Sequence, residues 1–204
     1  MSTYHHGNLR AALIEAAAEL ARVHGPGGVV LREVARRTGV SHNAAYRHFA
    51  DRDALLAAVA EVGMERLGGA MQARLADVSC ADPTRRSAEQ LRAVGRAYVD
   101  FALTEPGLFR VAFTAGPESL SEQRTDEVGA AAANPYDLLN EVLDDCVVAG
   151  SVAPERRLGA EVVCWAAVHG YAVLHLDGPL NGLPAEERAA TLEVMLDHIA
   201  RGLA

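Results

Sequence analysis

Three side chains that can read or hold a nucleic acid follow Ser41, a residue type that often caps a helix. They are His42, Asn43 and Arg47. An asparagine amide pairs well with adenine, and an arginine guanidinium binds guanine or a phosphate through two parallel hydrogen bonds. The small Ala44 permits close packing on the opposite side of the same helix. This segment therefore predicts contacts with bases and phosphates.

Two short helices joined by a glycine turn are expected to position these side chains, over roughly residues 29–49. The apolar spacing that begins at Leu31 predicts a first helix over 31–38, Gly39 can take the positive φ of a tight turn, and a second helix follows over 42–49. The arrangement is that of a helix-turn-helix, whose second helix lies in the major groove of DNA. Spacing alone also fits a packed helical hairpin with a solvated face of arginine and histidine.

Charge is distributed unevenly along the 204 residues, whose formal net charge is -8. Residues 1–52 hold seven Arg and four acidic residues, giving +3, whereas residues 53–204 hold twelve Arg and 23 acidic residues, giving -11. Binding to phosphates favours a positive surface. We therefore expect a DNA-binding domain over 1–52 and a second, acidic domain over 53–204.

Several other classes of protein are disfavoured. Cys80, Cys146 and Cys164 are far apart and odd in number, so neither a disulfide framework nor a zinc site is expected. Signal-peptide and membrane-spanning patterns are not found, which predicts a cytoplasmic protein without membrane contact. An enzyme is the rival class, but no phosphate-binding loop, dinucleotide fingerprint or catalytic constellation occurs, and we expect no cofactor. The adjacent His5 and His6 point apart in an extended segment, so an arm near DNA is expected there rather than a metal site.

Helical periodicity continues along the chain and predicts an all-α fold of about nine helices. Asn8 and Asp51 are the expected caps of two of them, and Gly150 is expected to end a third. Residues 115–134 are small and polar without an apolar period, which predicts a loop. The helices predicted besides the two short ones span residues 8–24, 51–75, 87–104, 108–113, 135–149, 154–176 and 184–203.

The helix-turn-helix segment resembles the DNA-binding domain of the TetR family of transcriptional regulators. The residues that carry this resemblance are Val34-Ala35, Gly39-Val40-Ser41, Tyr46, His48-Phe49 and Arg52-Asp53-Ala54-Leu55. Two further motifs are similar to a TetR C-terminal domain with a W-x-x-x-H-G signature: the run from Tyr98 to Phe113, and Trp165 followed by His169-Gly170. The chain departs from the family pattern at Ala45, where a larger apolar residue is common, and at Arg52, where a lysine is common.

The resemblance implies a set of DNA-contacting residues on the two short helices and at the start of the next. Within it, Tyr46 and His48 are expected at backbone phosphates, Arg52 at a phosphate at the start of the following helix, and Phe49 in the core. The full set is Arg32, Ser41, His42, Asn43, Ala44, Tyr46, Arg47, His48 and Arg52. One such motif has a small footprint, whereas two motifs related by a twofold axis can read a near-palindromic operator with half-sites about 34–36 Å apart.

The resemblance also implies that the acidic domain binds a ligand and forms a homodimer. The dimer is expected through residues of about 154–176 and 184–203, packed as a four-helix bundle. An apolar or aromatic small molecule is the expected effector. The residues expected to contact it are Met64, Leu67, Phe101, Phe109, Phe113, Trp165 and His169, with Met71, Tyr136 and Tyr171 as further pocket walls. Each can instead be plain core, and His169 can be a core residue, an interface residue or a ligand contact.

Together these expectations describe a sequence-specific repressor that an effector releases from duplex DNA. The effector must bind the state that is incompetent for DNA better than the competent one, since equal affinity shifts nothing. The alternatives are a helical ligand-binding module that does not bind DNA, and an activator.

Overall fold

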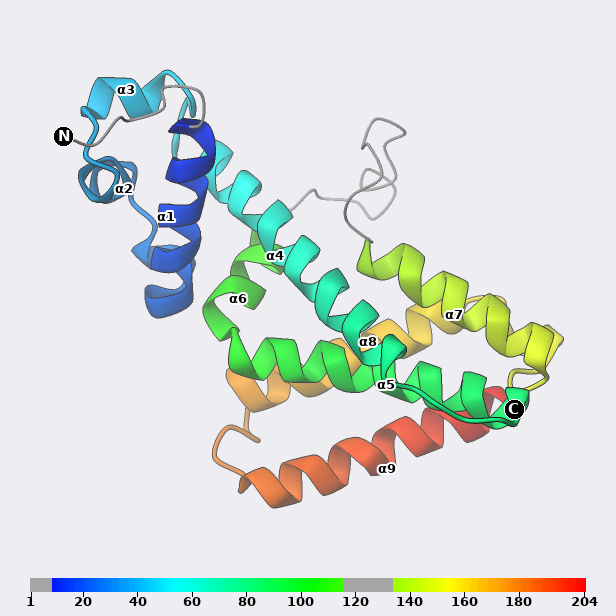
Figure 1. The fold of residues 1–204 in the computed structure, drawn as a ribbon. Helices are drawn as coiled ribbons and strands as arrows, with labels where there is room; N and C mark the ends of the chain where they lie inside the picture. Colours follow the sequence, from blue (N-terminus) through cyan, green and yellow to red (C-terminus); the bar gives the residue numbers. More distant parts are fainter. Residues whose placement is uncertain (1–8, 116–133) are drawn as a thin grey trace. The chain divides into compact units, whose positions relative to one another are not determined.

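The computed structural model describes residues 9–115 and 134–204, and these residues are helical without a strand (Figure 1). This confirms the predicted all-α fold. The described α-helices are α1 (Leu9–His24), α2 (Leu31–Arg37), α3 (His42–Tyr46), α4 (Arg52–Ala76), α5 (Pro83–Thr104), α6 (Pro106–Thr114), α7 (Pro135–Ala149), α8 (Ala160–Leu176) and α9 (Ala185–Leu203). Short 3₁₀ turns, η1 (Pro26–Gly28) and η3 (Pro154–Arg156), precede α2 and α8.

Internal contacts divide the described chain into two compact units. The first unit comprises residues 9–64 and 105–115, and the second comprises residues 65–104 and 134–204. The helix-turn-helix lies in the first unit, which also contains α6. The predicted boundary after residue 52 separates a DNA-binding domain from a second domain by function and not by compactness, and it stays a prediction.

Helix α6 packs against α1 in the first unit, although 81 residues separate the end of α1 from the start of α6. A Cβ atom added to Gly107 would lie 1.9 Å from the carbonyl oxygen of Ala21, so only glycine permits this approach. An ion pair joins the same two helices: Arg22 Nε donates to Glu105 Oε2 at 2.5 Å, and Arg22 Nη2 donates to Glu105 Oε1 at 2.7 Å. Helix α6 is thereby fixed to the helix that opens the DNA-binding motif.

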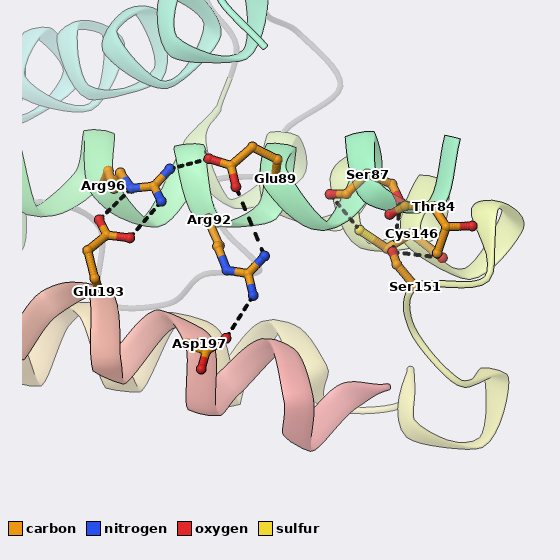
Figure 2. A network of polar contacts seen from close by, with 9 residues as sticks. All are labelled: Thr84, Ser87, Glu89, Arg92, Arg96, Cys146, Ser151, Glu193 and Asp197. Carbon is orange, nitrogen blue, oxygen red and sulfur yellow. Dashed lines mark hydrogen bonds and ion pairs between the residues drawn. The ribbon is translucent and has the colours of Figure 1, made fainter. Parts of the chain in front are cut away.

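Helix α5 forms the centre of the second unit and packs against α7, α8 and α9. A Cβ on Gly95 would lie 2.6 Å from Leu196 Cδ2, which shows how closely α9 approaches α5. Ion pairs connect the same helices along one side (Figure 2). Arg92 pairs with Asp197 at 3.0 Å. Arg96 donates two parallel hydrogen bonds to the Glu193 carboxylate, from Nε and from Nη2, each 2.6 Å long.

The observed helix ends correct some predictions. The predicted helix over 154–176 is wrong at its start: η3 comes first, Gly159 takes a left-handed φ of 78°, and α8 begins only at Ala160. The predicted helix over 87–104 begins earlier, at Pro83, because Asp82 Oδ1 accepts a hydrogen bond from Arg85 N at 2.8 Å and caps the first turn. The predicted helix over 42–49 ends at Tyr46.

Two of the predicted helix ends are confirmed. Asp51 Oδ1 accepts a hydrogen bond from Ala54 N at 2.8 Å, and Gly150 ends α7 with a φ of 76°. The expected cap at Asn8, the expected arm at residues 4–8 and nearly all of the expected loop at 115–134 lie outside the described residues.

Candidate nucleic-acid interface

The turn between α2 and α3 has the conformation that the sequence predicts. Gly39 adopts a φ of 70°, a left-handed value that favours glycine. Ser41 caps α3, because its hydroxyl oxygen accepts a hydrogen bond from Ala44 N at 3.2 Å. Ala44 and Ala45 are buried, so they form the inner side of α3, where small side chains let the helix pack closely.

The outer side of α3 and the turn that follows it present polar and aromatic side chains to solvent. The ring of His42 contacts the ring of Tyr46 edge to face, with centroids 4.6 Å apart, and Tyr46 is 44% exposed. Phe49 is buried, as predicted, and the Arg10 guanidinium lies 5.3 Å from its ring centroid. The exposed residues of the predicted DNA-contacting set are Arg32, Ser41, His42, Asn43, Tyr46, Arg47, His48 and Arg52.

The arginines of the motif differ in whether a carboxylate neutralises them. Arg36 and Arg37 both pair with Glu33, at 2.7 and 3.1 Å. Hydrogen bonds from both arginines, with Arg36 contributing more than Arg37, lower the pKa of Glu33 to about 2. Within the part of the chain that the structure describes, Arg32 and Arg47 form no ion pair. They are therefore the motif arginines whose charge is available to a phosphate or a base.

Arg52 has a contact that sequence reasoning missed. Its Nε donates to the carbonyl oxygen of Val29 at 2.8 Å, and its Nη2 donates to the carbonyl oxygen of Pro26 at 2.5 Å. The guanidinium at the start of α4 thus holds the connection between α1 and α2. Because arginine carries five N–H donors, these bonds leave a phosphate contact possible, and that contact stays a prediction.

The residues predicted to contact an effector are divided between the two units. Met64, Phe109 and Phe113 lie in the first unit, where the rings of the two phenylalanines are 4.8 Å apart. Leu67 and Phe101 are buried in the second unit, which also contains the half-buried Trp165 and His169. Their role as ligand contacts stays a prediction.

A small cavity in the second unit has a volume of about 30 Å³. That volume accommodates about one water molecule, whereas pockets for drug-sized ligands measure about 300–1,000 Å³. Trp165 and Met71 line it, as do residues that sequence reasoning did not single out. The lining residues are Met71, Leu91, Arg92, Val94, Gly95, Tyr98, Pro135, Leu139, Cys164, Trp165, Val168, Leu196 and Ile199.

Polar and aromatic contacts surround this cavity. The hydroxyl of the buried Tyr98 lies 2.8 Å from His169 Nδ1, and its ring centroid lies 5.7 Å from that of Trp165. Burial raises the pKa of Tyr98 above its usual range and lowers the pKa of His169, so both groups are neutral near pH 7. The ring centroid of Tyr136 lies 5.8 Å from that of Trp165. The Tyr171 hydroxyl donates a hydrogen bond of 2.5 Å to the carbonyl oxygen of Arg188, a residue of α9.

Among residues 9–115 and 134–204, no group of three or more His, Cys, Asp or Glu side chains is placed to hold a metal ion. Over the same ranges, no helix combines the length and apolar character needed to cross a bilayer.

Two protein-family models match this chain. Residues 13–59 match the family described as bacterial regulatory proteins, tetR family, and this range contains α2 and α3. Residues 91–199, more than half of the chain, match the tetracyclin repressor-like C-terminal domain. The chain belongs to the TetR family. The resemblance inferred from the motifs is thereby confirmed.

Individual proteins are also similar to this chain. A protein of unknown function from Rhodococcus sp. RHA1 is 30% identical, covers 100% of both chains and superposes with a TM-score of 0.75. An HTH-type transcriptional repressor of Mycobacterium tuberculosis is 32% identical over 91 residues, which are 44% of this chain and 46% of the relative. The match thus spans less than half the length of that curated relative. A TetR variant from Acinetobacter baumannii AYE in complex with minocycline is 19% identical over 94% of each chain, and its TM-score of 0.62 shows the shared fold.

Proposed function

We propose that this TetR-family protein is a sequence-specific transcriptional repressor that binds duplex DNA as a homodimer and leaves its operator when a small molecule binds. The observation that carries the proposal is the exposed side of α3. It presents His42, Asn43 and Tyr46 to solvent, and Arg47 follows with no carboxylate partner among the described residues. Such a surface suits a helix in the major groove.

In the proposed complex, each exposed group has a role that its chemistry permits. His42 and Asn43 at the start of α3 contact base edges, and Arg47 contacts a guanine or a phosphate. Tyr46 and His48 donate to backbone phosphates, which set the orientation of the helix without reading sequence. Arg32 adds a phosphate contact from α2, while the Ser41 cap and the buried Ala44 hold α3 in place for these contacts.

A homodimer through residues of about 154–176 and 184–203 is supported by the surface of α8 and α9. Val162 and Val163 are 58% and 56% exposed on α8, and Val194 is 57% exposed on α9. Apolar groups gathered on two neighbouring helices favour burial against another protein surface. A second copy would also supply the second α3 that a near-palindromic operator requires.

The small cavity beside Trp165 is relevant to the proposed release by an effector. Apart from Arg92 and the Tyr98 hydroxyl, apolar and aromatic groups dominate the lining, which suits an apolar or aromatic ligand. At about 30 Å³ the cavity is too small for such a molecule, so an effector that binds at this cavity requires a more open conformation. Repression is relieved only if that open conformation binds the operator more weakly.

Binding to the DNA upstream of the protein's own gene, measured by fluorescence anisotropy, tests the proposal. We expect Arg47→Ala to weaken binding about 10- to 100-fold, the effect of losing one bidentate contact. Arg86→Ala is the matched control, because Arg86 is an exposed arginine of the second unit and its loss changes the net charge equally. Equal affinities of wild type and Arg47→Ala at matched salt would exclude α3 as the reading helix.

Two outcomes would favour the alternatives. If the wild-type protein binds neither its upstream DNA nor any duplex selected from a random pool, a helical ligand-binding module is the better description. If it binds, a reporter gene placed under the control of that DNA distinguishes a repressor from an activator. Deleting the gene of a repressor raises reporter expression, whereas deleting the gene of an activator lowers it.

A further inference from the structure

Leu158 is the most exposed of the large apolar side chains in the described chain, at 97%. It lies in the brace loop, which we define as residues 153–159, between α7 and α8. A single exposed leucine is common on protein surfaces and needs no explanation by itself. The loop that carries it, however, is held unusually firmly.

Arg157 connects the brace loop to two helices. Its Nε donates to Asp144 at 2.6 Å and its Nη2 donates to Asn140 Oδ1 at 2.9 Å, and both partners lie on α7. Its Nη1 donates to Glu161 of α8 at 2.8 Å. Three acceptors on one planar guanidinium fix its orientation. The residue directly before Leu158 is therefore held in place.

The brace loop is also bonded to the end of α9. Ala153 N donates to the carbonyl oxygen of Leu203 at 2.8 Å, and Arg156 Nη1 donates to that of Gly202 at 2.6 Å. On the other side of Leu158, Gly159 takes the left-handed conformation that starts α8. An exposed leucine on a loop with these restraints loses little conformational freedom when another surface covers it, which is a property of interface anchors.

The charge of the surrounding surface indicates which surface covers Leu158. Residues 53–204 carry a net charge of -11, so two copies of this chain repel least where the contact surface has no net charge. The brace loop and α8, residues 153–176, hold two acidic residues, Glu155 and Glu161, and two arginines, Arg156 and Arg157, so their charges cancel. A twofold interface places one patch against its own copy, and a patch without net charge meets itself without net repulsion.

We propose that Leu158 is an anchor of the contact between two copies of this chain, and that Arg157 is its positioning residue. The inference rests on the homodimer of the proposed function and adds the residues that hold it together. Leu158 is buried against the second copy together with the exposed Val162 of α8, and Arg157 removes the charge of Glu161 from that surface while fixing the loop.

Sedimentation equilibrium of the full chain, over a range of concentrations, tests the anchor. We expect Leu158→Ala to raise the dimer dissociation constant by about 50-fold or more. Both subunits of a twofold dimer carry the substitution, so the buried methyl groups are lost from both sides of the contact. Val23→Ala is the control, since Val23 is 70% exposed on α1 in the first unit, and its dimer should match wild type. The exposure of Leu158 means that its truncation leaves the fold intact, which circular dichroism checks.

Arg157→Ala tests the positioning role. It should weaken the dimer by about 10-fold with Leu158 present, and Leu158→Ala should add little to it, because an unfixed loop no longer presents the leucine. Arg157→Ala leaving the dissociation constant at the wild-type value, or effects that simply add, would assign Arg157 to monomer stability alone.

The results separate this inference from the proposed dimer. A wild-type protein that stays monomeric at every concentration refutes both. A wild-type dimer that Leu158→Ala leaves unchanged refutes the anchor, assigns Leu158 to some other partner and leaves the proposed function standing.

Discussion

Replacing Arg52 distinguishes a structural role for this residue from a role in binding phosphate. The guanidinium donates to the carbonyl oxygens of Val29 and Pro26, at 2.8 and 2.5 Å, while the side chain is 43% exposed. A hydrogen bond from a charged donor contributes about 1.5–3 kcal/mol when buried, and solvent reduces this at a partly exposed site. We therefore expect Arg52→Ala to lower the free energy of unfolding of the first unit by roughly 1–2 kcal/mol, with Arg52→Lys in between.

Two optical signals allow that loss to be assigned to the first unit. The chain contains one tryptophan, Trp165, which lies in the second unit, whereas far-UV circular dichroism reports helices of both units. In urea, Arg52→Ala should lower the midpoint of the circular dichroism transition more than that of the fluorescence transition. Unchanged midpoints by both signals would refute the bracing role.

The salt dependence of DNA binding completes the comparison for Arg52. If the residue also binds a phosphate, the slope of log K against log salt decreases in magnitude by about 0.9 in Arg52→Ala and stays at the wild-type value in Arg52→Lys, which keeps the charge. If Arg52 only braces the connection, both variants keep the wild-type slope.

Two further perturbations test the packing of each unit. Gly107→Ala should lower the thermal unfolding midpoint of the first unit by at least about 5 °C, because the added Cβ would overlap the Ala21 carbonyl oxygen. If the variant keeps the wild-type midpoint, α6 does not pack on α1 as described. Lowering the pH from 7 to 3.5 should destabilise the second unit partly through Glu193, whose pKa a hydrogen bond from Arg96 holds below the ordinary 4.5. The stabilisation by this pair is present above pH 4.5 and lost as the pH falls through the lowered pKa, so Glu193→Gln should be less stable than wild type at pH 7 and lose less on acidification. Equal acid sensitivity of the two proteins in thermal unfolding would contradict this.

The features predicted correctly from the sequence depend on residues close together in the chain. The turn at Gly39 and the cap at Ser41 require only their immediate neighbours, so residue type and spacing were sufficient. The pairing of Glu33 with Arg36 and Arg37 was missed, although the signal was present: acidic and basic residues three and four positions apart on one helix are neighbours.

Contacts between distant residues could not be predicted in the same way. Arg52 bonds to backbone carbonyls 23 and 26 residues away, and a carbonyl oxygen carries no sequence signal, since every residue has one. The contact of Gly107 with Ala21 has the same character, because it joins backbone to backbone. Glycines at 107 and 95 were visible in the sequence, but their partners were not.

One contact in the structure narrows the set of roles that the sequence allowed for His169. The sequence allowed a core, an interface or a ligand-contacting histidine, and the structure adds a hydrogen bond of 2.8 Å between its Nδ1 and the buried Tyr98 hydroxyl. Because burial lowers the pKa of His169, the ring is neutral near pH 7, and the tautomer of the ring decides whether its Nδ1 or the Tyr98 hydroxyl donates in this bond. The ring is only half-buried, so this bond orients it without enclosing it. A purely internal role is therefore disfavoured, and a ligand or a second copy that contacts His169 meets a ring whose orientation Tyr98 has already set.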